Sequence, residues 1–138
     1  MDYEQAVEKI RIENSPILDE FQARLEDSGV KPKTIKSHLD NIRFFAEYLV
    51  YNEPLRKIDE AGASDVYSFL VDWFPRKAMW ASESNTKSYL ASFRKFFKFL
   101  HESQRVDEET KDEVYLTLKE DRDEFLDAVA CDDEDYWE

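Results

Sequence analysis

Hydrophobic residues recur at intervals of three and four along most of this chain, the spacing that places side chains on one face of an α-helix. The first clear stretch lies between Ser15 and Gly29. Ser15 followed by Pro16 is typical of an N-cap with proline at the first helical position, and Gly29 is typical of a helix end. We predict a short amphipathic helix here, preceded by an N-terminal helical extension over residues 1–14. Its apolar face carries Ile17, Leu18, Phe21 and Leu25.

Two further helices are predicted in the middle of the chain. The first runs from Lys31 to Tyr51, and its apolar stripe comprises His38, Ile42, Phe45 and Leu49. The second opens at Ser64 and ends at Pro75, because the residue before a proline is disfavoured in helical geometry. Its inward face carries Val66, Phe69, Leu70 and Trp73. A histidine on an apolar stripe is more typical of the core than of a ligand site, so we expect His38 to be buried and hydrogen-bonded.

Two helices complete the predicted set. The polar cluster at residues 82–85 is typical of a helix start, and the helix that follows carries Tyr89, Phe93, Phe96 and Leu100 on its apolar face. Acidic residues from Asp107 onward favour the start of a last helix, with Val114, Leu118, Phe125 and Val129 facing inward. The like-charged run after Ala130 predicts a disordered acidic tail over residues 131–138.

An internal similarity appears when the chain is compared with itself at an offset of 51 residues. Lys36-Ser37-His38-Leu39 then aligns with Lys87-Ser88-Tyr89-Leu90, and Tyr48-Leu49 aligns with Phe99-Leu100. Two copies are too few for a solenoid. We therefore interpret the two long helices as partners that pack matched apolar stripes into one core, the alternative being chance similarity between two amphipathic helices.

Composition supports an all-α fold in a single domain. The chain has 138 residues, of which 42% are hydrophobic and 37% charged, and only 2 Gly and 4 Pro interrupt it. This favours a helical bundle of about five helices over a sheet protein rich in tight turns. The predicted units are a helical domain over residues 15–105 and an acidic C-terminal helix over residues 106–130 that packs on it, between the extension and the tail.

Several of these segments resemble the N-terminal core-binding domain of tyrosine recombinases and phage integrases. Residues 28–39, Ser-Gly-Val-Lys-Pro-Lys-Thr-Ile-Lys-Ser-His-Leu, are similar to the family's entry into its first long helix, and residues 44–49 to the end of that helix. Residues 63–70 are similar to its short middle helix, and residues 84–100 to its closing helix. The resemblance implies a SAM-like helical module that forms half of a clamp around DNA.

The catalytic part of that family is missing from this chain. Neither His38 nor His101 begins the His-x-x-Arg motif that helps to neutralise the scissile phosphate, and only 33 residues follow the resembling region. The two histidines, one cysteine and absence of a Gly-rich loop also leave no pattern for a metal or a cofactor. We therefore predict a protein that is not an enzyme, a non-catalytic DNA-binding module.

Net charge opposes DNA binding at first sight, because phosphate contacts rely on Lys and Arg. The formal charge is −13, yet residues 107–138 hold 15 acidic and 3 basic residues, so the first 106 residues are nearly neutral. Within them, Lys87, Arg94 and Lys98 share a helix face opposite the apolar stripe, and Lys36 with Arg43 repeats this arrangement. The full candidate set is Lys31, Lys33, Thr34, Lys36, Arg43, Arg76, Lys77, Lys87, Arg94 and Lys98.

The basic helix face and the aromatic residues around Pro75 each have a purely structural explanation as well as a functional one. Any exposed helix carries charge opposite its core, so the basic stripe alone does not distinguish DNA binding from solvation. Trp73, Phe74, Met79 and Trp80 form either an exposed patch for a partner or part of the core, and we predict core. The alternative function is a protein-interaction or regulatory module that binds a protein partner, such as a recombinase clamp, through acidic or aromatic surface. No run of eighteen apolar residues or leader is present, so we expect a cytoplasmic protein without a membrane partner.

Overall fold

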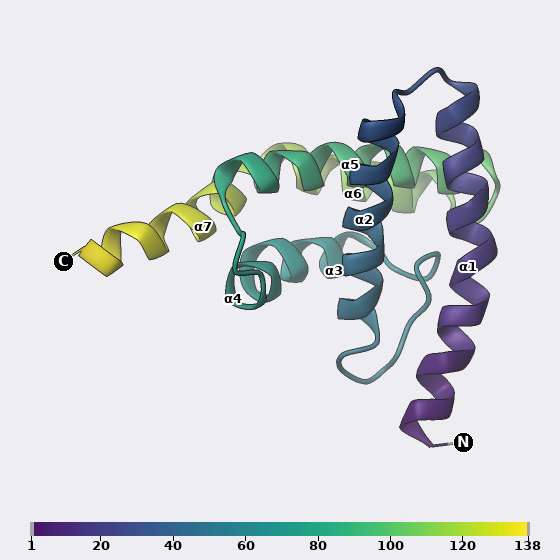
Figure 1. Ribbon diagram of the computed structural model, residues 1–138, viewed down its shortest axis with the longest axis horizontal. Coiled ribbons are helices and arrows are strands. Elements are labelled where there is room, and N and C mark those ends of the chain that lie inside the picture. Colours follow the sequence, from purple (N-terminus) through teal and green to yellow (C-terminus); the bar gives the residue numbers. More distant parts are fainter. Residues whose placement is uncertain (1, 138) are drawn as a thin grey trace.

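The computed structural model describes the backbone of residues 2–137 and the side chains of residues 2–130. All regular secondary structure in this part of the chain is helical, without strands, and it forms the single all-α domain that the sequence predicts. In Figure 1, α1 and α2 lie side by side while α5 and α6 cross behind them. The elements are α1 (Tyr3–Asp27), α2 (Pro32–Leu49), α3 (Ala63–Ser68), the π-helix η1 (Phe69–Trp73), α4 (Phe74–Lys77), α5 (Glu83–Glu102), α6 (Glu108–Glu120) and α7 (Arg122–Trp137). None of these helices is long and apolar enough to cross a membrane.

Helix α1 is one helix of 25 residues, so the prediction of a helix beginning at Ser15 is wrong. Pro16 lies inside it, although an internal proline costs roughly 3 kcal/mol because a backbone hydrogen bond is lost. Packing outweighs that cost, since Val7 before the proline and Phe21 after it are both buried. Asn14 also connects α1 to the loop that follows α2, because its side-chain oxygen accepts a hydrogen bond from the Ile58 N–H at 3.1 Å.

The end of α1 forms at Gly29, as the sequence predicts. Gly29 adopts φ +79°, and the N–H of Val30 donates to the Leu25 carbonyl at 3.1 Å while the Gly29 N–H donates to Glu26 at 3.0 Å. These two bonds satisfy carbonyls that a helix end otherwise leaves unpaired. The turn brings the start of α2 back along α1.

The centre of the core is the crossing of α2 and α5. Phe45 and Phe93 are fully buried and their rings meet edge to face, with centroids 4.8 Å apart. The expectation for His38 is confirmed, because it is 5% exposed and its Nδ1 lies 2.6 Å from Ser92 Oγ. Burial lowers the pKa of His38, and the positive charge of Lys95 lowers it further.

The prediction that Pro75 ends a helix is wrong. The chain remains helical from Ala63 to Lys77, passing through the π-helix η1 before reaching the proline. Pro75 is the second residue of α4, and near a helix start the missing N–H needs no partner. The wider turn of η1 thus creates a new helix start within a continuous helical path.

The predicted last helix is two helices, α6 and α7, separated at Asp121. Each half packs its own apolar residues, Val114 and Leu118 in α6 and Phe125 and Val129 in α7, and all four are buried. The break is the physical reason for the difference, because it lets α7 pack on η1 and α5 while α6 packs on α3 and α5.

The tail also differs from expectation. The backbone of residues 131–137 continues α7 as helix, where the sequence predicts disorder. Adding residues to an existing helix gains one hydrogen bond each without a new nucleus. The side chains of residues 131–138 lie outside the described residues.

Candidate nucleic-acid interface

Helix α5 presents a stripe of positive charge to solvent. Between Lys87 and Lys98 its exposed residues are Lys87, Ala91, Arg94, Lys95 and Lys98. We call the four cations the cationic stripe. None of the four forms an ion pair with any side chain that the structure describes. This stretch therefore holds four positive charges without an exposed carboxylate between them.

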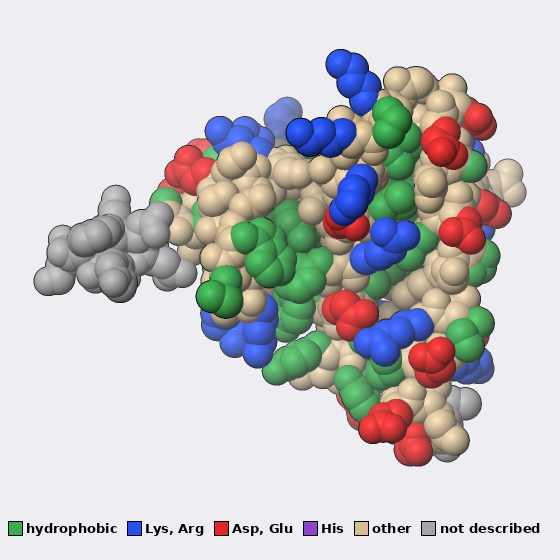
Figure 2. All heavy atoms as spheres, in the orientation of Figure 1, with side chains coloured by type: hydrophobic (Ala, Val, Ile, Leu, Met, Phe, Trp, Pro, Cys, Tyr) green, Lys and Arg blue, Asp and Glu red, His purple; other side chains and the backbone are tan. Residues whose placement is uncertain are grey.

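The stripe is exposed because the opposite side of α5 forms the core. Phe93, Phe96 and Leu100 are fully buried, which fixes the rotation of the helix about its own axis. The Ser82 hydroxyl caps the start of α5 by accepting a hydrogen bond from the Asn85 N–H at 3.1 Å. In Figure 2, Lys and Arg side chains gather along the upper edge of the molecule, where α5 and the start of α2 lie in Figure 1.

A groove of about 530 Å³ lies between α5 and α6, beside the stripe. Three members of the stripe line it, together with Lys111 from α6. Its one acidic side chain, Glu102, is already paired, because Arg24 Nη1 lies 2.6 Å from its Oε1. The lining residues are Arg94, Lys95, Lys98, His101, Glu102, Lys111 and Tyr115.

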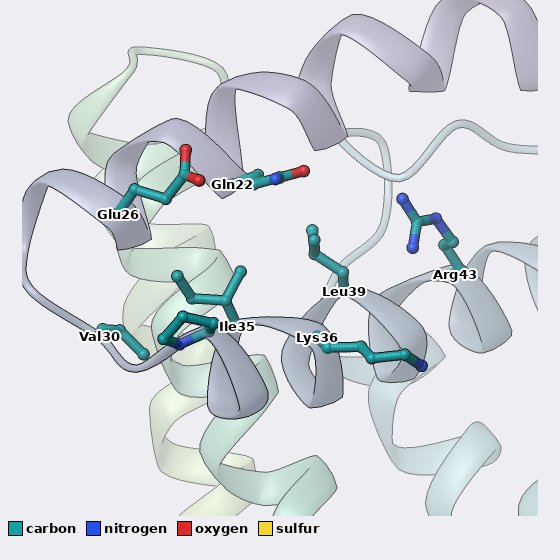
Figure 3. Close-up of a pocket in the computed structure, with 8 residues that line it drawn as sticks. Gln22, Glu26, Val30, Ile35, Lys36, Leu39 and Arg43 are labelled. Atoms are coloured by element: carbon teal, nitrogen blue, oxygen red, sulfur yellow. The ribbon is translucent and has the colours of Figure 1, made fainter.

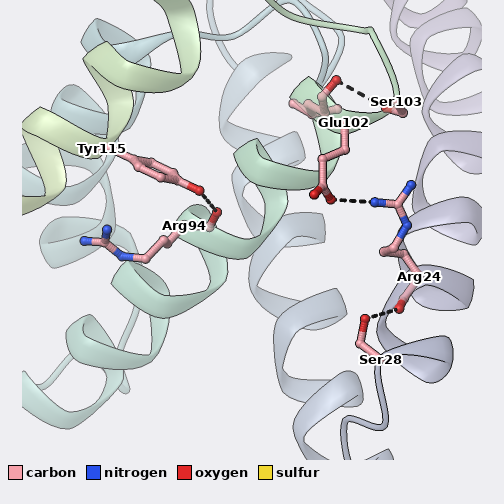
Figure 4. Close-up of polar contacts among 7 residues, drawn as sticks. Arg24, Ser28, Arg94, Glu102, Ser103 and Tyr115 are labelled. Atoms are coloured by element: carbon pink, nitrogen blue, oxygen red, sulfur yellow. Dashed lines mark hydrogen bonds and ion pairs between the residues drawn. The ribbon is translucent and has the colours of Figure 1, made fainter. Parts of the chain in front are cut away.

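Tyr115 holds two of these cations at the groove wall. Its hydroxyl donates to the backbone carbonyl of Arg94 at 3.3 Å, a contact drawn in Figure 4. The Arg94 guanidinium carbon lies 5.1 Å from the ring centroid and the Lys111 Nζ lies 5.4 Å from it. A cation over an aromatic face gains about 0.5–1 kcal/mol at an exposed site, so the ring orders both cations. Lys111 also pairs with Asp112, whose Oδ1 lies 3.4 Å from its Nζ, whereas Arg94 forms no ion pair with a described side chain.

The start of α2 adjoins the stripe. Val30, the residue before Lys31, lines a small cavity together with Lys95 and Lys98. Lys31, Lys33 and Thr34 are exposed at this end of α2, and neither lysine forms an ion pair within the described residues. Five predicted residues besides Thr34 therefore carry unpaired charge on this side of the molecule: Lys31, Lys33, Lys87, Arg94 and Lys98.

The other candidates are placed differently. Lys36 Nζ lies 2.7 Å from Asp40 Oδ2, and Arg43 Nη1 lies 3.6 Å from Asp40 Oδ1, so one carboxylate offsets both cations. Arg76 of α4 pairs with Asp72 of η1 through two contacts of 3.0 Å, and this pairing raises the pKa of Arg76 and lowers that of Asp72. Lys77 donates to the Tyr51 hydroxyl at 3.2 Å. These four residues do not share one unpaired surface with the stripe.

Sequence reasoning missed three residues of the interface, Lys95, Lys111 and Tyr115. Lys95 had only a partial signal, because it follows Arg94 directly and lies about 80° around the helix from Lys87 at 3.6 residues per turn. Lys111 and Tyr115 had none, since they come from α6 and reach the groove only through tertiary packing.

A second groove, of about 520 Å³, lies between α1 and α2 (Figure 3). Val30, Ile35 and Leu39 form an apolar floor, with Glu26 on the α1 side and the Asp40-paired cations Lys36 and Arg43 on the α2 side. Both of its cations are already paired, whereas the stripe cations that line the α5–α6 groove form no ion pair with a described side chain. Among the described residues, no three His, Cys, Asp or Glu side chains converge as a metal site requires.

Comparison with known families gives one match. The family model described as DUF7108, C-terminal domain, matches residues 23–105, which is more than half of the chain. No curated protein and no solved structure matches the chain.

This match corrects the resemblance to the core-binding domain of tyrosine recombinases, which is wrong. The region over which that resemblance was drawn, residues 15–105, is nearly the region that the DUF7108 model matches. The similar segments consist of helix starts and apolar spacings, which any small helical bundle of this kind needs. Such patterns specify amphipathic helices and their order, and they carry no family-specific chemistry.

Proposed function

We propose that the protein, which belongs to the DUF7108 family, binds double-stranded DNA through the cationic stripe of α5 and does so without catalysis. The stripe would contact phosphates, with Lys111 of the α5–α6 groove and the lysines at the start of α2 extending the contact surface. Phosphate contacts position a protein on a duplex and carry little sequence information.

The observation that carries the proposal is that no described side chain forms an ion pair with the stripe. The chain has 32 acidic and 19 basic residues, so acidic partners for surface cations are in excess. Of the fifteen Lys and Arg outside the stripe, nine form ion pairs within the described structure, and Asp40, Glu47, Asp72 and Glu102 are among their partners. A run of four unpaired cations against that background supports an external anion as the partner.

A duplex fits the stripe better than a single strand. The distance along α5 from Lys87 to Lys98 is about 16 Å at 1.5 Å per residue, comparable to several phosphates of one strand. Recognition of single strands relies on aromatic side chains on which bases stack. The stripe exposes only Lys, Arg and Ala, and Tyr115 beside it is already covered by two cations.

The experiment is binding of a duplex DNA across a salt series, followed by fluorescence anisotropy. With four to five phosphate contacts, the logarithm of affinity should fall against the logarithm of salt with a slope of about −4. Lys98→Glu should weaken binding and reduce the slope. Lys119→Glu, which reverses an exposed lysine of α6 outside the groove, is the matched control and should change neither. No binding at the lowest salt, or equal losses in both variants, would refute the proposal.

A further inference from the structure

The face formed by α2 and α4 exposes a group of large hydrophobic side chains, which Figure 2 shows as an area of hydrophobic side chains on the left half of the molecule. Met79 is 100% exposed, Trp80 53% and Tyr51 51%. Phe44 joins them, with its ring centroid 5.2 Å from that of Trp80. We call Phe44, Tyr51, Met79 and Trp80 the aromatic patch. The prediction that Met79 and Trp80 are core is therefore wrong, whereas Trp73 and Phe74 are buried as predicted.

The exposure has a structural cause. Trp73 and Phe74 fill the space beneath the patch, and Trp73 already contacts Phe44 with ring centroids 5.0 Å apart. The connection between α4 and α5 then has no space left in the core for two more large side chains. Isolated exposed apolar residues are ordinary, but a contiguous group of this kind marks interaction surfaces.

Two hydrogen-bond donors lie at or beneath the patch, the Trp73 indole and the Lys77 ammonium. Trp73 is 7% exposed, and its indole Nε1 is buried without a hydrogen-bond partner among the described residues. The Lys77 ammonium lies 5.0 Å from the centroid of the Tyr51 ring and forms no ion pair within the described chain. A buried donor without a partner destabilises the folded state, so the position of Trp73 is maintained by its packing. Lys77 is exposed and its one acceptor among the described residues is the neutral Tyr51 hydroxyl at 3.2 Å, so a complementary occupant supplies carboxylates for this cation.

The backbone beneath the patch is also unusual. Trp73 ends the π-helix η1, and the N–H of Phe74 donates to the Phe69 carbonyl, five residues earlier. π-Helical turns are rare and occur frequently at functional sites. This turn places Trp73 under the patch and is independent of the exposure of Trp80.

We propose that the aromatic patch binds the C-terminal segment of a second copy of this chain. Residues 132–138, Asp-Asp-Glu-Asp-Tyr-Trp-Glu, combine five carboxylates with two aromatic side chains. That composition complements a patch with apolar rings and the exposed Lys77 cation. Aromatic residues of such a segment supply large buried area, and the carboxylates supply the acceptors.

The direction of α7 favours a second copy, rather than the same chain, as the source of the bound segment. Its backbone is helical as far as Trp137, and in Figure 1 this end of α7 projects away from the other helices. A segment held away from its own body is available to another molecule. Reciprocal exchange between two copies gives a closed dimer with two identical contacts.

The test is the concentration dependence of self-association, measured by sedimentation velocity on the full chain under reducing conditions. Trp80→Ser should raise the dissociation constant about tenfold or more, because aromatic anchors dominate most interfaces. Leu116→Ser is the matched control, since Leu116 on α6 is also 53% exposed and lies outside the patch. It should leave the dissociation constant unchanged.

A charge exchange identifies the segment that binds. Lys77→Glu and Asp135→Lys should each weaken self-association several-fold, and the double variant should recover most of the loss if the two side chains meet. A chain that stays monomeric at every concentration overturns the proposal. So does self-association that Trp80→Ser and Leu116→Ser weaken equally, or that shows no recovery in the double variant.

Discussion

Helices α2 and α5 are built on one plan, yet they present different charges to solvent. At an offset of 51 residues, Ile42 corresponds to Phe93 and Leu49 to Leu100, and all four are buried. The cations Lys36 and Arg43 correspond to Lys87 and Arg94, and all of these are exposed. The correspondence thus covers both the core face and part of the solvent face.

The difference lies at three positions, at one of which Phe44 of α2 corresponds to the exposed Lys95 of α5. Asp40, which pairs with both α2 cations, corresponds to Ala91, and Glu47, which pairs with Arg11 at 2.9 Å, corresponds to Lys98. Exposed ion pairs contribute about 0–1 kcal/mol to stability, so neither pattern is required for folding. The comparison therefore separates what the fold needs, the shared apolar stripe, from what the fold leaves free, the charge pattern on which the proposed function of α5 rests.

The largest expected effect concerns the shared stripe. Phe93→Ala should lower the free energy of unfolding by about 3–5 kcal/mol and Ile42→Ala by about 2–5 kcal/mol, because both side chains are 0% exposed at the crossing. Chemical denaturation measures both values. Ala91→Ser, on the solvent face of α5, is the control and should change stability by less than about 0.5 kcal/mol. A small loss in either core variant would show that the two helices do not share the core equally.

The second prediction transfers the α2 charge pattern to α5. The double variant Ala91→Asp, Lys98→Glu should lower affinity for duplex DNA about 100-fold at low salt and reduce the salt slope by about three, because Lys87 and Arg94 gain a carboxylate partner and Lys98 is reversed. Thermal unfolding should remain close to that of the parent. Unchanged affinity would place any DNA contact away from α5.

The third prediction makes the reverse change in α2. Asp40→Ala frees Lys36 and Arg43, which should raise DNA affinity about threefold at low salt and steepen the slope by about one. Asp72→Ala, which frees Arg76 on α4 in the same way, is the control and should have no effect on binding. Equal gains in both variants would indicate a general effect of net charge rather than a local interface.

The parts of this structure that the sequence predicted are those set by local pattern. The apolar stripe of α5 and the Gly29 helix end follow from spacing and backbone conformation alone. The continuation of α1 through Pro16 could not be predicted in this way. Burial of side chains on both sides of the proline outweighs its local tendency to begin a helix. The π-turn before Pro75 and the single break at Asp121 likewise depend on what each helix packs against.

In the candidate site, too, the sequence predicted the features set by local pattern and missed those set by tertiary contacts. Helical periodicity placed Lys87, Arg94 and Lys98 on one exposed face, and the structure has them there. Periodicity does not show which cations are paired, so Lys36 and Arg43 looked equivalent to their counterparts until Asp40 was seen between them. The exposure of Trp80 was unpredictable for a related reason, since only the packed core shows that Trp73 and Phe74 already fill the available space.

The smallest expected effect is a pH dependence located at the crossing itself, where α2 carries His38 and α5 carries Tyr89 at the corresponding position. The folded-state pKa of His38 is lowered below its ordinary 6.5, first by burial and then by Lys95. Between the two pKa values, His38 is protonated in the unfolded chain and neutral in the folded chain. The free energy of unfolding therefore falls as the pH drops through 6.5 toward the folded pKa. Asp72 and Asp107, whose pKa values are lowered from 3.8, act only at more acidic pH. Urea midpoints measured between pH 7.5 and 5 should decline in the parent and stay flatter in His38→Gln, whose amide retains a hydrogen bond to Ser92. Parallel declines in the two proteins would assign the pH dependence to other groups.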